Sequence, residues 1–259
     1  MDERLVGQRR QPRDGASHRG HVSPREVRAP DAAGEERVAA EQMSLAQKTD
    51  PAGGVSGCVQ YLEAEIAHLL ERVSPADTVL ELGCGYGRVA FRLAGRARKV
   101  VGIDNAPENL ELAAALKGTV SNCEFIGMDA LATGFPDGLF DVVACVQNGI
   151  CAFGVDRELL VREALRVTRP GGRAIFSSYS DRVWDERLHW FEMQAEEGLV
   201  GEIDREKTGN GTIVCRDGFR AGSMGEKGFA GLCGLLGCLF EIALVDDSSV
   251  FCQLTRAAR

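Results

Sequence analysis

Short apolar runs alternate with amphipathic stretches through the middle of the chain. The apolar runs have the length and β-branched character of buried strands, and they cover residues 78–82, 100–104, 123–126, 140–146 and 172–177. The stretches between them have apolar residues at helical spacing and cover residues 86–96, 106–116 and 156–167. Strands that alternate with helices at this spacing predict a doubly wound parallel sheet.

The two flanks of this region extend the pattern. Ser56 can cap a helix that runs to Val73, with its apolar positions at helical spacing. Towards the other end, a helix is expected over 226–236, and strands over 239–245 and 249–255. A turn as short as the one between these strands requires that they run antiparallel. The predicted fold is therefore an α/β, mostly parallel, seven-stranded sheet that ends in an antiparallel β-hairpin.

A long segment, residues 179–224, separates the fifth strand from the last helix. Its first part predicts a helix capped by Ser180 or Asp181, with Trp184 and Phe191 on one apolar stripe. Its second part predicts a hairpin that turns at 208–211, where Thr, Gly, Asn and Gly follow one another. We expect a helix plus hairpin insertion after strand five, placed to cover a substrate.

The first 53 residues differ from the rest of the chain. They mix basic and acidic residues with Gly, Pro, Gln and Ser, and large apolar residues are scarce. Such a segment buries too little apolar surface to offset its ordering entropy, so we expect a disordered tail over 1–53 and one domain over 54–259. Met43 stands shortly before the first expected helix, and one hypothesis is that translation starts there.

Composition narrows the class of protein. The formal net charge is −8, which disfavours the basic surface that nucleic acids or anionic membranes require. No apolar run reaches the roughly 20 residues of a membrane helix, and the first residues lack the apolar core of a signal peptide. The nine cysteines form no C-x-x-C pair. We expect free thiols, no metal site and a cytoplasmic location.

The glycine loop after the first strand carries the main functional signal. Residues Val79–Leu82 form an apolar run that contains one acid, Glu81. Gly83, Gly85 and Gly87 follow at every second position. Glycine is needed where a ligand must lie against the backbone, and a helix that starts after such a loop favours an anionic or nucleotide-like group. Asp104 ends the next strand about 20 residues on, where an acid can bind a ribose diol.

This pattern resembles the first motif of the class I S-adenosylmethionine-dependent methyltransferases. The third glycine comes one position too early for a dinucleotide fingerprint, and Arg88 stands where that fingerprint has its last glycine. The closing antiparallel hairpin is also similar to this family. The resemblance implies that the three glycines flank the methionine half of S-adenosylmethionine, with Glu81, Cys84 and Asn105 beside them, and that Asp104 binds the ribose hydroxyls.

Further cofactor contacts follow from the same resemblance. Asp129, in the loop after the third strand, would accept a hydrogen bond from the adenine amino group. Ala130 would offer its backbone N–H to the ring, and Met128 would pack on its face. Gln147 and Asn148 lie just past the fourth strand, in the ligand crevice of an open α/β sheet. Tyr61 on the first helix is a further candidate contact, although a role in core packing is an equally good interpretation.

The acceptor of the methyl group is less well defined by the sequence. His189 and Tyr179 are candidate general bases, and ordinary packing or surface roles are equally compatible with both. The residues after the fourth strand are Gln147, Asn148 and Gly149, and the chain has no Pro-Pro pair, unlike DNA and RNA amino-methyltransferases. We therefore expect a small-molecule acceptor, no nucleic acid and no membrane partner, with a homodimer possible. The alternatives are a non-catalytic sensor of the same cofactor and a nicotinamide-dependent oxidoreductase.

Overall fold

The computed structural model describes the backbone of residues 56–258 and the side chains of residues 60–258. The expectations for residues 1–53 and for Met43 lie outside this range. Helices and strands follow one another in the order α2 Ser56–Leu70, β1 Thr78–Leu82, α3 Arg88–Ala94, β2 Lys99–Asp104, α4 Pro107–Leu116, β3 Cys123–Gly127, β4 Phe140–Cys145, α5 Gly149–Ala152, α6 Arg157–Val167, β5 Thr168–Tyr179, η1 Asp181–Val183, α7 Trp184–Glu196, β6 Ile213–Val214, β7 Arg220–Ala221, α8 Glu226–Leu236, β8 Leu239–Val245 and β9 Ser249–Thr255.

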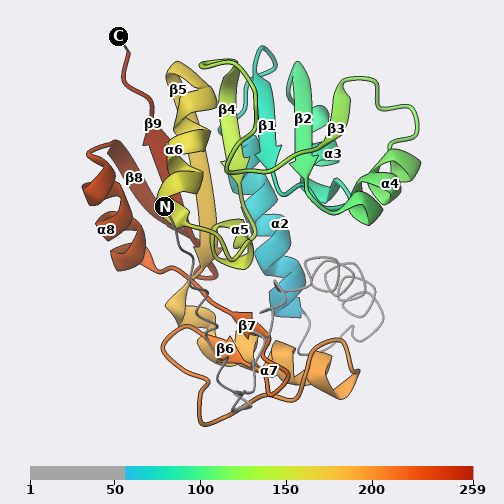
Figure 1. Cartoon of the computed structure of the whole chain (residues 1–259), viewed down its shortest axis with the longest axis vertical. Helices are drawn as coiled ribbons and strands as arrows, with labels where there is room; N and C mark the ends of the chain where they lie inside the picture. The colour runs from blue at the N-terminus through green and yellow to red at the C-terminus, as the bar shows by residue number, and fades with distance from the viewer. Residues whose placement is uncertain (1–55, 259) are drawn as a thin grey trace, which may run out of the picture.

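A seven-stranded sheet forms the centre of the molecule, and it confirms the predicted fold class. Its strand order is β3-β2-β1-β4-β5-β9-β8. Strands β1 to β5 pair in parallel, whereas β9 pairs antiparallel with both β5 and β8. The carboxyl ends of the parallel strands therefore meet at one edge of the sheet, which faces downwards in Figure 1.

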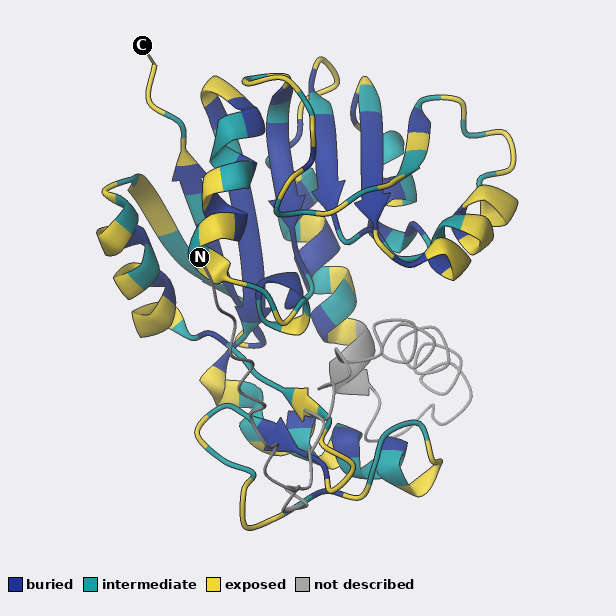
Figure 2. Ribbon diagram, in the orientation of Figure 1, coloured by how far each residue is buried: buried dark blue, intermediate teal, exposed yellow. Residues whose placement is uncertain are grey.

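Helices cover both faces of this sheet, and the buried strands lie between them (Figure 2). On one face, Ile150 of α5, Leu160 of α6 and Phe229 of α8 pack against the strands. On the other face, Ile66 and Leu69 of α2 pack with apolar residues of α3 and the sheet. Burial on both faces explains why β1, β2 and β4 appear in the sequence as nearly continuous apolar runs.

Most element boundaries match the pattern within one or two residues, and the differences have local causes. The helix expected from residue 86 begins at Arg88, because Gly87 adopts a left-handed conformation that a helix interior excludes. The short helix α5 was not expected. Strand β5 is longer at both ends than the predicted 172–177, since Thr168 pairs with Phe140 of β4 before a register shift, and Ser178 and Tyr179 pair with β9.

The insertion lies below the carboxyl ends of the parallel strands (Figure 1). Ser180 caps its first turn, as predicted, by accepting a hydrogen bond from the backbone N–H of Arg182. The chain turns at 208–211 as predicted: Gly209 and Thr212 exchange two backbone hydrogen bonds of 2.9 Å, and Ile203 pairs antiparallel with Cys215. Strands β6 and β7 form a second antiparallel pair around the following turn. Phe191 of α7 packs with Ile203 and Ile213 in a small core that is separate from the cores on the sheet.

No helix within residues 56–258 is long and apolar enough to cross a membrane. Among the side chains of residues 60–258, no group of three or more His, Cys, Asp or Glu residues is arranged to hold a metal ion. The cysteines of this part of the chain are free thiols, and most of them are buried.

The irregular first part of β5 gives a test of the fold. A Cβ atom at Gly172 would lie 2.7 Å from the carbonyl oxygen of Asp141 and 2.9 Å from that of Arg169, which are backbone atoms that cannot move aside cheaply. We expect Gly172→Ala to lower the free energy of unfolding by about 1–3 kcal/mol, as overpacking does in general.

Gly231→Ala is the matched control. Gly231 lies inside α8, and nothing stands within 4 Å of its added Cβ. Alanine should stabilise this helix by about 0.5–1 kcal/mol because it lowers the entropy of the unfolded chain. Urea denaturation of both variants measures the difference, and equal stability of the two would contradict the described packing at Gly172.

Candidate active site

The glycine loop follows the carboxyl end of β1, and its three glycines adopt left-handed backbone conformations. Gly83, Gly85 and Gly87 have φ angles of 68°, 51° and 90°. A Cβ at Gly85 would meet nothing within 4 Å, whereas one at Gly83 would lie 2.3 Å from the Phe153 ring. The loop therefore needs glycine for its conformation, and at Gly85 the backbone faces open space that a ligand can use.

Asp104 fixes this loop to the end of β2. Its side chain is 3% exposed, and its two carboxylate oxygens accept hydrogen bonds from the backbone N–H groups of Gly85 (2.9 Å) and Ala106 (2.8 Å). The backbone N–H of Cys84 also bonds the carbonyl oxygen of Ile103 (2.9 Å). The predicted ribose-binding acid is thus adjacent to the glycine loop and is held rigidly against it.

Glu81 is a second buried carboxyl group at this edge, with 4% of its surface exposed. Burial raises the pKa of Glu81 to about 8, the charge of Arg88 opposes this rise and the charge of Asp104 adds to it. Its Oε2 atom has no hydrogen-bond partner among the described residues. A buried acid with a free oxygen suits a cationic or hydrogen-bond-donating ligand group.

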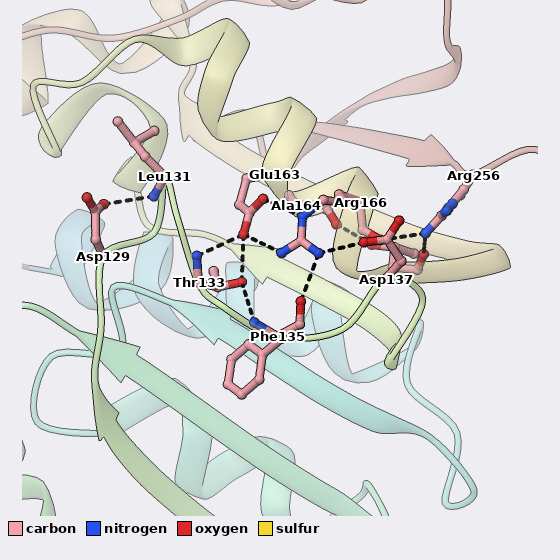
Figure 3. Close-up of polar contacts among 10 residues, drawn as sticks. Asp129, Leu131, Thr133, Phe135, Asp137, Glu163, Ala164, Arg166 and Arg256 are labelled. Atoms are coloured by element: carbon pink, nitrogen blue, oxygen red, sulfur yellow. Dashed lines mark hydrogen bonds and ion pairs between the residues drawn. The ribbon is translucent and has the colours of Figure 1, made fainter.

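Asp129 lies on the loop after β3, within the segment shown in Figure 3. It is exposed, and its Oδ1 accepts a hydrogen bond from the backbone N–H of Leu131 (2.8 Å). The backbone N–H of Met128 bonds the carbonyl oxygen of Asp104 (2.9 Å), which places this loop beside the predicted ribose acid. Ala130 follows in the same loop and is half-buried, whereas Asn105, after β2, is exposed.

A charged clamp on α6 holds the rest of that loop (Figure 3). The carboxylate of Glu163 accepts hydrogen bonds from the backbone N–H (2.8 Å) and the hydroxyl (2.7 Å) of Thr133. Arg166 bonds the same carboxylate and also donates to Asp137 (2.7 Å). Arg166 and Thr133 lower the pKa of Glu163 to about 2, so the clamp stays charged at neutral pH.

The turn after β4 contains two consecutive non-glycine residues in left-handed conformation. Gln147 and Asn148 have φ angles of 57° and 65°. The side-chain oxygen of Gln147 accepts a hydrogen bond from Arg88, and its buried Nε2 has no partner among the described residues. Gln147 is therefore adjacent to the glycine loop, as predicted, and has an amide N–H group available to a ligand.

The Asn148 side chain is used differently from the expectation. Its Nδ2 donates to the carbonyl oxygen of Gly222 in the insertion (3.0 Å), and its Oδ1 accepts from the hydroxyl of Ser178 at the end of β5 (2.7 Å). The Ser178 hydroxyl also accepts from the backbone N–H of Met224 (2.8 Å). The side chain of Asn148 thus fixes the insertion to the sheet edge.

Aromatic and cationic groups gather beside this attachment. The Tyr61 ring stacks on the Tyr179 ring, with 4.5 Å between centroids, and the guanidinium carbon of Arg187 lies 4.5 Å from the Tyr179 centroid. Arg187 is 4% exposed and donates to the carbonyl oxygens of Gly211, Ala221 and Gly222. Within residues 60–258 it forms no ion pair with a carboxylate. Tyr61 and Tyr179 therefore lie together at the acceptor side of the edge.

His189 lies apart from this cluster. Its side chain is 60% exposed on α7, and its closest charged partner is Glu192 at 3.7 Å. The structure does not bring His189 to the strand ends, so we do not retain it as a general base.

Two buried polar residues of the site were missed by the sequence analysis. Glu65 and Arg187 both occupy buried positions of amphipathic helices, between apolar residues one turn away on either side. A charged residue on an apolar stripe was the signal that could have identified them, since such residues are rarely buried without a specific role.

Taken together, the edge presents an open glycine backbone, two buried carboxyl groups and a free amide. The charge of Arg88 lowers the pKa of Glu81, and the charge of Asp104 raises it. Buried acids beside an open glycine backbone suit a ligand that carries hydroxyl or cationic groups. Comparison with known proteins agrees with this geometry: residues 79–172 match the family model described as a methyltransferase domain. Residues 79–172 are therefore similar to known methyltransferase domains.

The proteins that match this part of the chain are named for different methyl acceptors. A 2-methyl-6-phytyl-1,4-hydroquinone methyltransferase from Synechocystis sp. is 35% identical over 44% of this chain and 35% of its own length. A protein described as a probable ribosomal RNA small subunit methyltransferase A from Methanosarcina mazei is 39% identical over 32% of this chain and 29% of its own. The chain thus spans only about a third of the length of these relatives.

Solved structures support the fold of the methyltransferase domain. A structure of an S-adenosylmethionine-dependent methyltransferase from Methanosarcina mazei superposes with a TM-score of 0.56 at 19% identity. The superposition covers 74% of this chain and 98% of the chain from Methanosarcina mazei. The cofactor is S-adenosylmethionine. The open backbone at Gly85, the free Oε2 of Glu81 and the free Nε2 of Gln147 are features of this chain that fit it.

Gly85 provides a test of the cofactor site. We expect Gly85→Ala to weaken binding of S-adenosylhomocysteine at least tenfold, because the new Cβ would enter the open space beside the loop. Gly237→Ala is the matched control, since Gly237 has a similar φ of 63°, has nothing within 4 Å of its added Cβ, and caps α8 at the opposite edge of the sheet. Both variants should lose about 1 kcal/mol of stability from left-handed strain. Calorimetric titration measures the affinities for S-adenosylhomocysteine. An equal loss of affinity in both variants would contradict a cofactor site beside Gly85.

The raised pKa of Glu81 predicts how stability depends on pH. A carboxyl group whose pKa is higher in the folded state stabilises the protein below its unfolded pKa, and this stabilisation is lost as pH rises through the folded pKa. The free energy of unfolding should therefore fall between about pH 5 and pH 8. Glu81→Gln should reduce this fall, and Glu111→Gln, at an exposed position of α4, should leave it unchanged. Urea denaturation across this pH range measures the free energy of unfolding. If it falls with pH in Glu81→Gln as steeply as in wild type, the raised pKa of Glu81 is contradicted.

Proposed function

We propose that the protein transfers the methyl group of S-adenosylmethionine to a small-molecule acceptor that binds beneath the insertion. The observation that carries this proposal is the attachment of residues 179–224 to the carboxyl ends of β4 and β5. Asn148 and Ser178 bond Gly222 and Met224 directly, next to the turn that contacts the cofactor loop. An acceptor reaching the reactive edge is therefore enclosed by the insertion.

An enclosed edge favours a small acceptor over a folded nucleic acid. Nucleic-acid enzymes need a basic surface to contact phosphates, whereas this chain has a formal net charge of −8. The turn after β4 contains Gln147, Asn148 and Gly149 in place of an Asn/Asp-Pro-Pro-aromatic motif. The quinone-precursor methyltransferase from Synechocystis sp. is a relative whose name is compatible with this choice.

The bound cofactor supplies a sulfonium group, which is already a good leaving group. The chain's residues must bind and orient the two reactants and exclude water. We assign cofactor binding to Glu81, Asp104 and the glycine loop, with Met128, Asp129 and Ala130 on the adenine side and Gln147 on the methionine side. Cys84 and Asn105 remain proposed neighbours of the bound cofactor.

Tyr61, Tyr179 and Arg187 form the proposed acceptor wall. Tyr179 ends β5 directly after Ser178, so its ring lies one residue from the attachment of the insertion. We retain Tyr179 as the candidate proton acceptor for substrates whose nucleophile must lose a proton. Arg187 and Asn148 both donate hydrogen bonds to the carbonyl oxygen of Gly222. This shared contact fixes the position of the acceptor wall relative to the turn after β4.

A binding experiment tests the cofactor part of this proposal. We expect calorimetry to detect binding of S-adenosylhomocysteine and no binding of NADH. Asp104→Ala should weaken S-adenosylhomocysteine binding at least tenfold, because a buried hydrogen bond to a charged group contributes about 1.5–3 kcal/mol. Glu124→Ala, at an exposed carboxylate that pairs with Lys99 at the start of β2, is the control and should bind as the wild type does. Unchanged affinity in a folded Asp104→Ala variant would refute the assignment.

A turnover experiment tests the acceptor class. Purified protein is incubated with S-adenosylmethionine and either a small-metabolite fraction or ribosomal RNA, and release of S-adenosylhomocysteine is measured. We expect release with small metabolites and none with RNA. Release only with RNA would overturn the acceptor class, and binding without any release would favour a sensor.

A further inference from the structure

Glu65 is a fully buried acid that the proposed reaction does not use. It lies on α2, and its side chain has no exposed surface. Its carboxylate accepts hydrogen bonds from the backbone N–H of Gln147 (2.7 Å) and the hydroxyl of Ser249 (2.9 Å), and the Ser177 hydroxyl also lowers its pKa. One acid on α2 thus connects the ends of β4 and β5 with the start of β9.

The bond to Gln147 reaches a strained part of the site. Two consecutive non-glycine residues in left-handed conformation persist only where surrounding contacts hold them, since each such residue costs on the order of 1 kcal/mol or more. The N–H of Gln147 is held by the Glu65 carboxylate and by the Ser177 hydroxyl (2.8 Å). The side chain of Gln147 in turn bonds Arg88, the first residue after the glycine loop. A continuous path of contacts therefore runs from Glu65 to the cofactor loop.

We propose that Glu65 is a positioning residue that holds the Gln147–Asn148 turn in its cofactor-binding conformation, and that only its ionised carboxylate does so fully. This inference rests on the proposed cofactor site. The polar groups that bond the carboxyl group are donors: the backbone N–H of Gln147 and the hydroxyls of Ser249 and Ser177. A carboxylate accepts from all of them, whereas a protonated carboxyl group must itself donate and so displaces at least one donor.

The surroundings place this ionisation near neutral pH. Burial raises the pKa of Glu65 to about 7, and the bonds from Ser177, Ser249, Gln147 and Tyr61 oppose the rise. The titratable groups that face it are Tyr61 on its own helix and Cys145 at the end of β4. Since a ligand that requires the ionised form binds better where that form is populated, affinity for the cofactor should rise as pH rises through about 7.

Glu65→Gln tests this inference, because it keeps the size of the side chain and removes its charge. We expect calorimetry with S-adenosylhomocysteine to show about tenfold weaker binding than wild type at pH 8 and binding within about twofold at pH 6, where the wild-type carboxyl group is mostly protonated. Glu81 also titrates at this site, but it is present in both proteins, so its effect cancels in their ratio. A purely structural role would give the same loss at both pH values.

Glu63→Gln is the matched control on the same helix. Glu63 is exposed and pairs with Arg92. The Glu63→Gln variant should therefore bind S-adenosylhomocysteine with the affinity of wild type at both pH values. Ser249→Ala is a second variant that keeps the Glu65 carboxyl group and removes one of its donors. It should move the rise in affinity to higher pH, and it keeps the inference testable if Glu65→Gln fails to fold.

The outcomes separate this inference from the function it rests on. Wild-type protein that does not bind S-adenosylhomocysteine at any pH would overturn both. Wild-type binding with an equal Glu65→Gln affinity at pH 8, or with the same loss at pH 6 and pH 8, would overturn the role of Glu65 alone. An unshifted pH profile in Ser249→Ala would also overturn it.

Discussion

Compensation of buried carboxyl groups is the constraint on which the reactive edge depends. Glu65, Glu81 and Asp104 are almost entirely removed from water where the parallel strands end. An unpaired buried charge is costly, and within this edge the compensation comes largely from backbone N–H groups. Asp104 accepts from Gly85 and Glu65 accepts from Gln147, and both of these donors have positive φ angles. The unusual backbone of the cofactor loop and of the turn after β4 therefore follows from the acids that they surround.

The insertion is attached to this edge by a different kind of contact. Asn148, Ser178 and Arg187 bond backbone groups near Gly222 and Met224, and the insertion has its own small apolar core around Phe191. Its position is thus fixed by directional hydrogen bonds and by Met224, which belongs to the core on one face of the sheet. The small core around Phe191 is separate from that core, so substitutions inside it need not disturb the strand ends.

The sequence predicted the glycine loop and the strand ends around it well because these signals are local. The spacing of Gly83, Gly85 and Gly87 and the acid at Asp104 depend on backbone approach and strand ends, which short segments specify. The roles of Glu65 and Asn148 were not predictable in the same way, because their partners lie 82 and 74 residues away in sequence, at Gln147 and Gly222. The turn at 208–211 was predictable because its glycines are a local signal, whereas the second pair, β6 with β7, was not expected.

The position of β9 has a consequence for how the protein is made. This strand follows all the others of the sheet in sequence, yet it lies inside the sheet, between β5 and β8. Its first residue, Ser249, pairs with Tyr179 and donates to Glu65. During synthesis, β9 is the last of these strands to leave the ribosome. The pairing that joins β5 to β8, and the hydrogen bond from Ser249 to Glu65, can therefore form only after the other strands have been made.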